Sequence, residues 1–84
     1  MSHRASRRFW RHFEDLTPEI QQLAREQYEL LKADPQHPSL HFKRVGAFRS
    51  VRVGSDFRAL GVDSLEGIVW FWIGRHDEYE RLIG

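Results

Sequence analysis

Three side chains in the second half of the chain, Arg58, His76 and Tyr79, have the chemistry to work on a phosphate group. An arginine keeps its positive charge at neutral pH, so Arg58 can meet a phosphate but cannot serve as a base there. Histidine is the side chain that most easily changes its protonation near neutral pH, which makes His76 a candidate for moving a proton. Tyr79 follows three residues later, about one helical turn on, so its ring and the imidazole can face the same way.

Arg58 is the least expected of the three, because side-chain alternation along a strand puts it on the same face as Leu60 and Val62. A guanidinium beside core residues needs a partner or a position at the rim of a sheet. One interpretation is an ion pair with Asp77 or Glu78. The other is a cation held on a rigid strand to meet a phosphate, and the sequence leaves both open.

His76 and Tyr79 also have purely structural interpretations. His76, with Arg75 before it, stands at or near the start of a short predicted helix, where a surface histidine can cap the helix. Tyr79 can simply pack with Leu82 and Ile83 on one side of that helix. For both residues the structural and the chemical interpretation stay open at this point.

Positive charge is concentrated in two parts of the chain. Residues 1–13 hold four arginines and no acid, and residues 41–60 hold five basic residues against one acid, although the formal net charge of the whole chain is only +1. Two such segments near each other in space would form a patch for a polyanion. Lys43 and Arg44 point to opposite faces of their strand, so only one of them can face a given groove. Arg52 should face away from its two valine neighbours.

The sequence also excludes several kinds of site. The chain has no cysteine, which excludes thiolate nucleophiles, disulfides and cysteine-based zinc sites. His37 and His41 are spaced by four residues, but Pro38 opposes a helical site and no third ligand is obvious, so we expect no metal and no cofactor. The longest apolar run, Ile68–Ile73, is too short to span a membrane, and Met1–Arg8 has no apolar segment behind its basic residues. We therefore expect a cytoplasmic protein without a membrane partner.

Apolar spacing in the first half of the chain predicts two helices over residues 8–34. The large apolar residues of the first segment recur on one helical face. Thr17 is then a good N-cap, Pro18 suits the first helical position, and Asp34, which precedes a proline, ends the second helix. Because the turn between the two helices is very short, we expect a helical hairpin.

The second half changes to short runs that are typical of strands. Four strands and a last helix are expected: Leu40–Val45, Ser50–Val53, Phe57–Val62, Ile68–Ile73 and helix Asp77–Ile83. Connections this short make only antiparallel pairs. The sequence therefore predicts an α+β fold, in which an N-terminal helical hairpin and a short C-terminal helix pack on one face of a four-stranded antiparallel sheet. We expect a single domain over residues 1–84, with residues 1–7 as a short basic N-terminal segment.

This order of parts resembles the RelE/ParE superfamily of toxins from bacterial type II toxin–antitoxin modules. The resemblance rests on the hairpin "VRVGSDFRALGV", on the apolar strand and "GRHDEY" that follow it, and on the helical hairpin ending in "DPQHP". It covers roughly residues 8–83 and implies a small microbial-ribonuclease-like domain of order ααββββα, often with an extra strand at the N-terminus. Met1–Ala5 is short and polar, so we expect that strand to be truncated or missing.

The resemblance also implies roles for particular residues. The strand arginine in the family's "YR" matches Arg58, the basic residue after the last strand matches His76, and the aromatic residue a few positions further on matches Tyr79. These three would be the catalytic residues. The residues expected to bind RNA are Lys43, Arg44, Arg52 and Arg75.

Members such as RelE, YoeB, HigB and YafQ are similar to microbial ribonucleases and cut messenger RNA in the ribosome. The resemblance thus implies an endoribonuclease toxin that acts on messenger RNA and the ribosome and has an antitoxin protein as partner. In metal-free cleavage by the 2′-hydroxyl, Arg58 would stabilise the phosphorane charge, His76 would be base or acid, and Tyr79 would hydrogen-bond or stack on a base. Two alternatives stay open: a non-catalytic ParE-type inhibitor of DNA gyrase, and a solitary non-toxic domain of the same fold.

Overall fold

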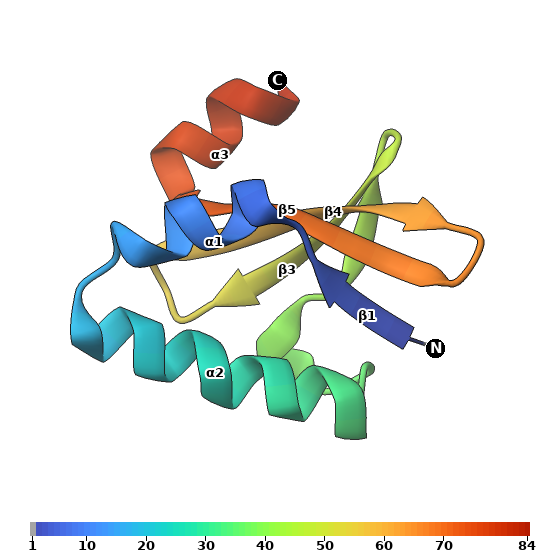
Figure 1. The fold of residues 1–84 in the computed structure, drawn as a ribbon, viewed down its shortest axis with the longest axis horizontal. Coiled ribbons are helices and arrows are strands. Elements are labelled where there is room, and N and C mark those ends of the chain that lie inside the picture. Colours follow the sequence, from blue (N-terminus) through green and yellow to red (C-terminus); the bar gives the residue numbers. More distant parts are fainter. Residues whose placement is uncertain (1) are drawn as a thin grey trace.

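The computed structural model describes residues 2–84. Within this range, three α-helices and a short 3₁₀ helix surround one five-stranded sheet (Figure 1). The helices are α1 Arg7–Glu14, α2 Pro18–Ala33, η1 Pro38–Leu40 and α3 His76–Ile83. The strands are β1 Ser2–Ala5, β2 Lys43–Val45, β3 Phe48–Val53, β4 Phe57–Ser64 and β5 Gly67–Arg75. No helix of the described residues has both the length and the apolar character needed to cross a membrane.

The helical hairpin is present, and local capping explains where its helices begin. The Thr17 hydroxyl accepts a hydrogen bond from the Ile20 N–H at 3.4 Å, and Pro18 is the first residue of α2. Ser6 caps α1 in the same way, because its hydroxyl accepts from the Phe9 N–H at 3.2 Å. These short-range rules give the hairpin without any help from the rest of the chain.

The α+β class is confirmed, but the sheet has one strand more than predicted. Its strand order is β1-β5-β4-β3-β2, and β2 to β5 form the expected antiparallel meander. Of the two alternatives for the first strand, truncated or missing, the second is wrong, because Ser2–Ala5 pairs parallel to β5 and makes the sheet mixed. This strand has only four residues, and its partner is the last strand of the chain, so neither hydrophobic alternation nor a nearby turn could indicate it.

Two features hold β1 at the sheet edge. Gly67 has a φ of +137°, and a Cβ at this position would collide with the backbone of Ser2, so glycine is required for the close approach. His3 is held by two other elements. Its Nδ1 accepts from the Trp70 Nε1–H at 3.1 Å, and the Tyr28 hydroxyl donates to its carbonyl at 3.3 Å. β1 is therefore tied to both β5 and α2.

The helices lie on both faces of the sheet, which corrects the expectation that all of them share one face. Figure 1 shows α2 on one side and α3 on the other. The larger core lies under α1 and α2, whereas Leu60, Trp72 and Tyr79 form a smaller core under α3. A bulge in β5 leaves Phe71 unpaired between two registers, so Phe71 and Trp72 both reach the smaller core. The apolar run of β5 thus supplies both cores.

The other predicted elements are present, with one difference that affects the site. Leu40 belongs to η1 and is fully buried, so the predicted strand Leu40–Val45 is reduced to β2. His41 ends η1 with a φ of +45°, in the left-handed region, and this turn directs the chain into β2 at Lys43. The remaining strands and the last helix extend one or two residues beyond the predicted bounds.

Candidate functional site

A groove of about 220 Å³ lies between α3 and the strands β2, β3 and β4. The polar side chains that line it come from these elements and from the turn before β2. Five of the seven predicted site residues reach it: Lys43, Arg52, Arg58, His76 and Tyr79. Residues far apart in the sequence therefore converge on one open hollow, as a site for a phosphate requires.

Arg52 and Arg58 are direct neighbours across β3 and β4, because the register pairs these two positions. Two like charges placed opposite each other on a sheet repel. Among residues 2–84 neither guanidinium forms an ion pair with a carboxylate. The possible pairing of Arg58 with Asp77 or Glu78 is absent, and its Nη1 instead donates to the carbonyl of Phe57 at 2.8 Å.

The electrostatics of this arginine pair favour an anion. Burial lowers the pKa of Arg58 from its usual value, and the charge of Arg52 lowers it further, against the opposing effects of Tyr79, Glu80 and Asp56. The Nε of Arg52 is buried and has no hydrogen-bond partner among the described residues. A buried donor without an acceptor costs about 1–3 kcal/mol. An anion in the groove would relieve both the repulsion and this cost.

His76 is fixed at the first position of α3 and faces the groove. Its backbone N–H donates to the carbonyl of Asp56 at 2.7 Å, which ties the start of α3 to the β3–β4 turn. Its Nε2 lies 3.0 Å from Oε1 of Glu80, one helical turn later, and its side chain is 44% exposed. A carboxylate that hydrogen-bonds an imidazole holds the ring in one orientation. The histidine is therefore both oriented and accessible.

Tyr79 has its ring in the core and its hydroxyl at the groove. The residue is only 4% exposed, and the ring packs with Leu60 and Trp72 under α3. Its hydroxyl lies 2.9 Å from Oγ of Ser50 on β3. The ring of His76 is 5.9 Å away, with an angle of 31° between the two planes. The ring is thus packed, as the structural interpretation predicted, and Ile83 belongs to the same cluster, but Leu82 is exposed and does not. The hydroxyl takes part in the groove.

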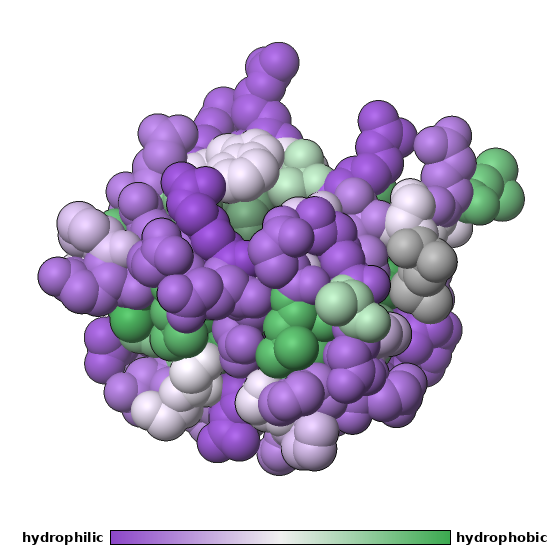
Figure 2. Space-filling view, turned by 90° about the horizontal axis from the view of Figure 1, so that it is seen from below, coloured by the Kyte–Doolittle hydropathy of each residue, from purple (hydrophilic) through white to green (hydrophobic). Residues whose placement is uncertain are grey.

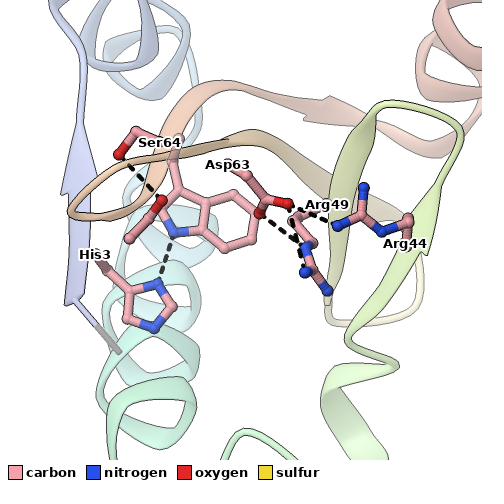
Figure 3. A network of polar contacts seen from close by, with 7 residues as sticks. His3, Arg44, Arg49, Asp63 and Ser64 are labelled. Carbon is pink, nitrogen blue, oxygen red and sulfur yellow. Dashed lines mark hydrogen bonds and ion pairs between the residues drawn. The ribbon is translucent and has the colours of Figure 1, made fainter.

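Two residues that were expected to bind RNA lie outside the groove. Arg44 points to the other face, where its Nη2 is 2.7 Å from Oδ2 of Asp63, and Arg49 shares the same carboxylate at 3.0 Å (Figure 3). These hydrogen bonds, from Arg49 and then Arg44, hold the pKa of Asp63 below its usual value. The guanidinium carbon of Arg75 lies 5.5 Å from the ring centre of Phe57. Both arginines have structural partners here.

Three polar residues of the groove were not predicted as part of this site: His41, Ser50 and Glu80. Two of them had a signal in the sequence. Ser50 is two residues before Arg52 on the same strand, and Glu80 is four residues after His76 on the same helix. His41 reaches the groove through the left-handed turn after η1, for which the sequence has no local signal such as glycine. No group of three metal-ligating side chains occurs among residues 2–84.

A larger cavity of about 530 Å³ lies on the opposite face of the sheet, against α1 and α2. Its lining is mostly aromatic and aliphatic, and it contains none of the seven predicted site residues. Trp10 and Tyr28, which are 45% and 38% exposed, also line this cavity. Seen from the side of α2, hydrophobic side chains show between hydrophilic ones (Figure 2). Its chemistry suits apolar contacts, whereas the smaller groove suits a phosphate.

Comparisons with known proteins agree with this fold. Residues 18–81 match the family model described as the ParE-like toxin domain. The chain is similar to a chain of the RelB–RelE antitoxin–toxin complex from Methanococcus jannaschii, with 10% identity, a TM-score of 0.71, and coverage of 96% of this chain and 99% of that one. The toxin–antitoxin complex RelBE2 from Mycobacterium tuberculosis gives 19% identity, a TM-score of 0.67, and coverage of 89% and 96%.

A copper-bound mutant toxin from Helicobacter pylori is also similar, with 16% identity, a TM-score of 0.61, and coverage of 93% of this chain and 97% of that one. No curated protein sequence matches the chain. At these identities the likeness to solved structures supports the fold, and function has to be argued from the site.

Proposed function

The chain belongs to the family of ParE-like toxin domains, and from that membership we propose that it is a toxin that cuts messenger RNA in the ribosome without a metal ion. The observation that carries the proposal is the arginine pair. Among residues 2–84, Arg52 and Arg58 lie side by side without a carboxylate partner, in the same groove as His76. A phosphodiester supplies the negative charge that this arrangement favours, and the histidine supplies a group that can move a proton.

The proposed reaction uses the nucleophile that RNA itself contains. The 2′-hydroxyl loses its proton and its oxygen bonds to the adjacent phosphorus, the bond from phosphorus to the 5′-oxygen breaks, and that oxygen takes up a proton. The products are a 2′,3′-cyclic phosphate and a 5′-hydroxyl end. Arg52 and Arg58 stabilise the charge that develops on the phosphorane oxygens, and Lys43 adds a third cation to the groove.

Two proton transfers are needed, and arginine can perform neither at neutral pH. His76 is the base for the 2′-hydroxyl or the acid for the leaving 5′-oxygen, with its ring held by Glu80 at 3.0 Å. His41 provides a second imidazole on the β2 side of the same groove for the other transfer. The Tyr79 hydroxyl adds a neutral hydrogen-bonding group beside the cations.

The experiment that tests this proposal is cleavage of messenger RNA on translating ribosomes, with the new 5′ ends mapped. Removing one charge-stabilising or proton-transferring group typically costs 10²–10³ in rate, so we expect Arg58→Ala and His76→Ala to lose about that much. Arg44→Ala and Arg75→Ala are matched controls, because both remove an arginine outside the groove, and they should cut nearly as fast as the parent.

Other outcomes would replace the proposal. Equal cutting by Arg58→Ala, His76→Ala and the parent contradicts the assigned roles. Inhibition of DNA supercoiling by gyrase without any RNA cleavage favours the ParE-type alternative. Harmless overexpression without cleavage favours a solitary, non-toxic domain.

As its partner we propose an antitoxin protein, since two of the similar structures are toxin–antitoxin complexes. The surface of α1 suits an acidic segment with apolar side chains. Arg7, Arg8 and Arg11 form no ion pair among residues 2–84, and the half-exposed Trp10 lies between them in the sequence beside the 530 Å³ cavity. In the cleavage assay, such a partner at equimolar concentration should stop the cutting.

A further inference from the structure

We infer that Ser50 is a positioning residue, which holds the Tyr79 hydroxyl so that this hydroxyl donates a hydrogen bond to a phosphate in the groove. The inference rests on the proposed function in taking the phosphate of RNA as the natural ligand. It is a statement about binding, so it can be tested without any cleavage.

Ser50 is an unusual residue for its place in the fold. It lies in the middle of the sheet, paired with Lys43 of β2 on one side and with Leu60 of β4 on the other, and it is 1% exposed. No other serine, threonine, glutamine or charged residue is buried among residues 2–84. Strand interiors favour β-branched and aromatic residues, and a buried hydroxyl costs free energy unless it is hydrogen-bonded. A serine here needs a specific partner.

That partner is the hydroxyl of Tyr79. The Ser50 Oγ–H donates to the Tyr79 oxygen at 2.9 Å, and the contact is buried. Each hydroxyl has a single proton and can also accept. In the inferred arrangement the tyrosine oxygen accepts the proton of Ser50, so the proton of Tyr79 is directed to another acceptor.

Cationic donors dominate the groove around Tyr79, in which the side chains that can accept, apart from Ser50, are Glu80 and the imidazoles of His41 and His76. Arg52, Arg58 and Lys43 line the same groove, and their side chains can only donate. Arg58 is close enough for its pKa to respond to Tyr79. The one carboxylate in the lining, Glu80, is bonded to His76 at 3.0 Å. An anionic oxygen of a ligand in the groove is therefore the acceptor that suits the Tyr79 proton.

The ring of Tyr79 is held independently of Ser50. It packs with Leu60 and Trp72, and α3 is tied to the β3–β4 turn by the bond from His76 N–H to Asp56 O at 2.7 Å. Removing the serine hydroxyl therefore leaves the ring in place and changes only where the tyrosine proton points. The expected effect is the loss of one well-aligned hydrogen bond, which is about threefold to tenfold in affinity.

The test measures binding of inorganic phosphate, and of an RNA oligonucleotide that is 2′-O-methylated at every residue and so cannot be cut. The variants are Ser50→Ala, Tyr79→Phe and the double variant. Each single variant should bind about threefold to tenfold more weakly, and the double variant should bind no more weakly than Tyr79→Phe alone, because both changes remove the same hydrogen bond. Factors that multiply in the double variant would overturn the inference.

A second measurement follows Tyr79 directly and does not require the variants to be compared by affinity. The chain has two tyrosines, and Tyr28 donates to His3 on β1, away from the groove, so it serves as an internal control. With tyrosine labelled by ¹³C at Cζ, phosphate should shift the Tyr79 resonance and leave that of Tyr28 unchanged. The shift should shrink in Ser50→Ala. A Tyr79 resonance that does not move at saturating phosphate would overturn the inference.

The two proposals fail in different ways. A parent protein that binds phosphate through Tyr79 but never cuts RNA contradicts the proposed function and keeps the inference. A parent that cuts RNA, with Ser50→Ala binding phosphate as tightly as the parent, contradicts the inference and keeps the proposed function.

Discussion

The pairing of Arg52 with Arg58 has a cost in stability that only a ligand can compensate. The two guanidinium groups are opposed on adjacent strands, and Nε of Arg52 is buried without a hydrogen-bond partner among the described residues. Like charges directly opposite each other destabilise a sheet, and a buried donor without an acceptor costs about 1–3 kcal/mol. Groups that destabilise the free protein in this way are typical of functional sites.

We therefore predict that Arg52→Met raises the free energy of unfolding by about 1 kcal/mol in the absence of RNA, because it removes the charge and the unpaired donor while keeping an apolar stem. Urea denaturation of the parent and the variant at neutral pH measures this. Lys43→Met is the control. It removes an exposed cation of the same groove and should change stability by less than about 0.5 kcal/mol. A less stable Arg52→Met protein would contradict the argument.

Side-chain alternation along the strands predicts which face many of the groove residues occupy. Period two correctly separated Lys43 from Arg44 and turned Arg52 away from its two valine neighbours, whereas the pairing of Arg52 with Arg58 follows from the register of β3 and β4. Alternation also places Ser50 on the groove face. Its hydrogen-bond partner on α3 is 29 positions away, so the sequence gives no sign that this serine differs from an ordinary strand residue. The left-handed backbone at His41 could not be read from the sequence, because a non-glycine residue rarely adopts it.

Among the elements, β1 depends most on contacts that are distant in the sequence. α1 and α2 begin at caps that act within three residues, and β2 to β5 follow each other through short turns, so local rules predict these elements. β1 has no such support, since its strand partner and the anchors of His3 come from β5 and α2. The position of α3 on the second face was unpredictable for a related reason. The bulge in β5 that exposes an extra aromatic residue to α3 has no signal of its own in an all-apolar run.

The anchor of β1 should make stability depend on pH. Burial lowers the pKa of His3, and nearby positive charges that include Lys32 lower it further. Folding therefore favours neutral His3, whose Nδ1 accepts from Trp70, and protonation there replaces the acceptor with a donor. The stability that neutral His3 contributes is complete above its pKa in the unfolded chain, about 6.5. It is lost as the pH falls from there through the lower pKa that His3 has in the folded protein.

We predict that the free energy of unfolding falls more steeply between pH 7 and pH 5 in the parent than in His3→Gln. Glutamine keeps an oxygen that can accept from the indole and has no proton to gain in this range. The other four histidines are present in both proteins, so their effects cancel in the difference. Urea unfolding at three pH values gives the slopes, and the protection factors of the β1 amides, which correct exchange rates for their intrinsic pH dependence, should fall on acidification in the parent alone. Equal slopes would show that His3 does not anchor the strand.

For the whole molecule, a net charge of +1 hides a strongly uneven distribution. On one face of the sheet, the carboxylate of Asp63 is shared by Arg44 and Arg49, so each of these arginines has an acidic partner. On the other face, Lys43 joins the arginine pair in a groove whose one carboxylate is bonded to a histidine. Within β2 and β3 of the described chain, the fold thus separates Arg44 and Arg49, which share a carboxylate, from Lys43 and Arg52, which form no ion pair.

This separation predicts how salt weakens RNA binding. Single-stranded nucleic acid gives a slope of about −0.7 in log affinity against log salt for each phosphate neutralised, so three groove cations predict a slope of about −2. The 2′-O-methylated oligonucleotide, titrated between about 50 and 300 mM KCl, measures it. Lys43→Met should bring the slope about 0.7 closer to zero. Arg44→Met, which removes a neighbouring cation already bound to Asp63, should leave it unchanged. If both variants flatten the slope equally, RNA contacts both faces of the sheet and the groove is not the only binding site.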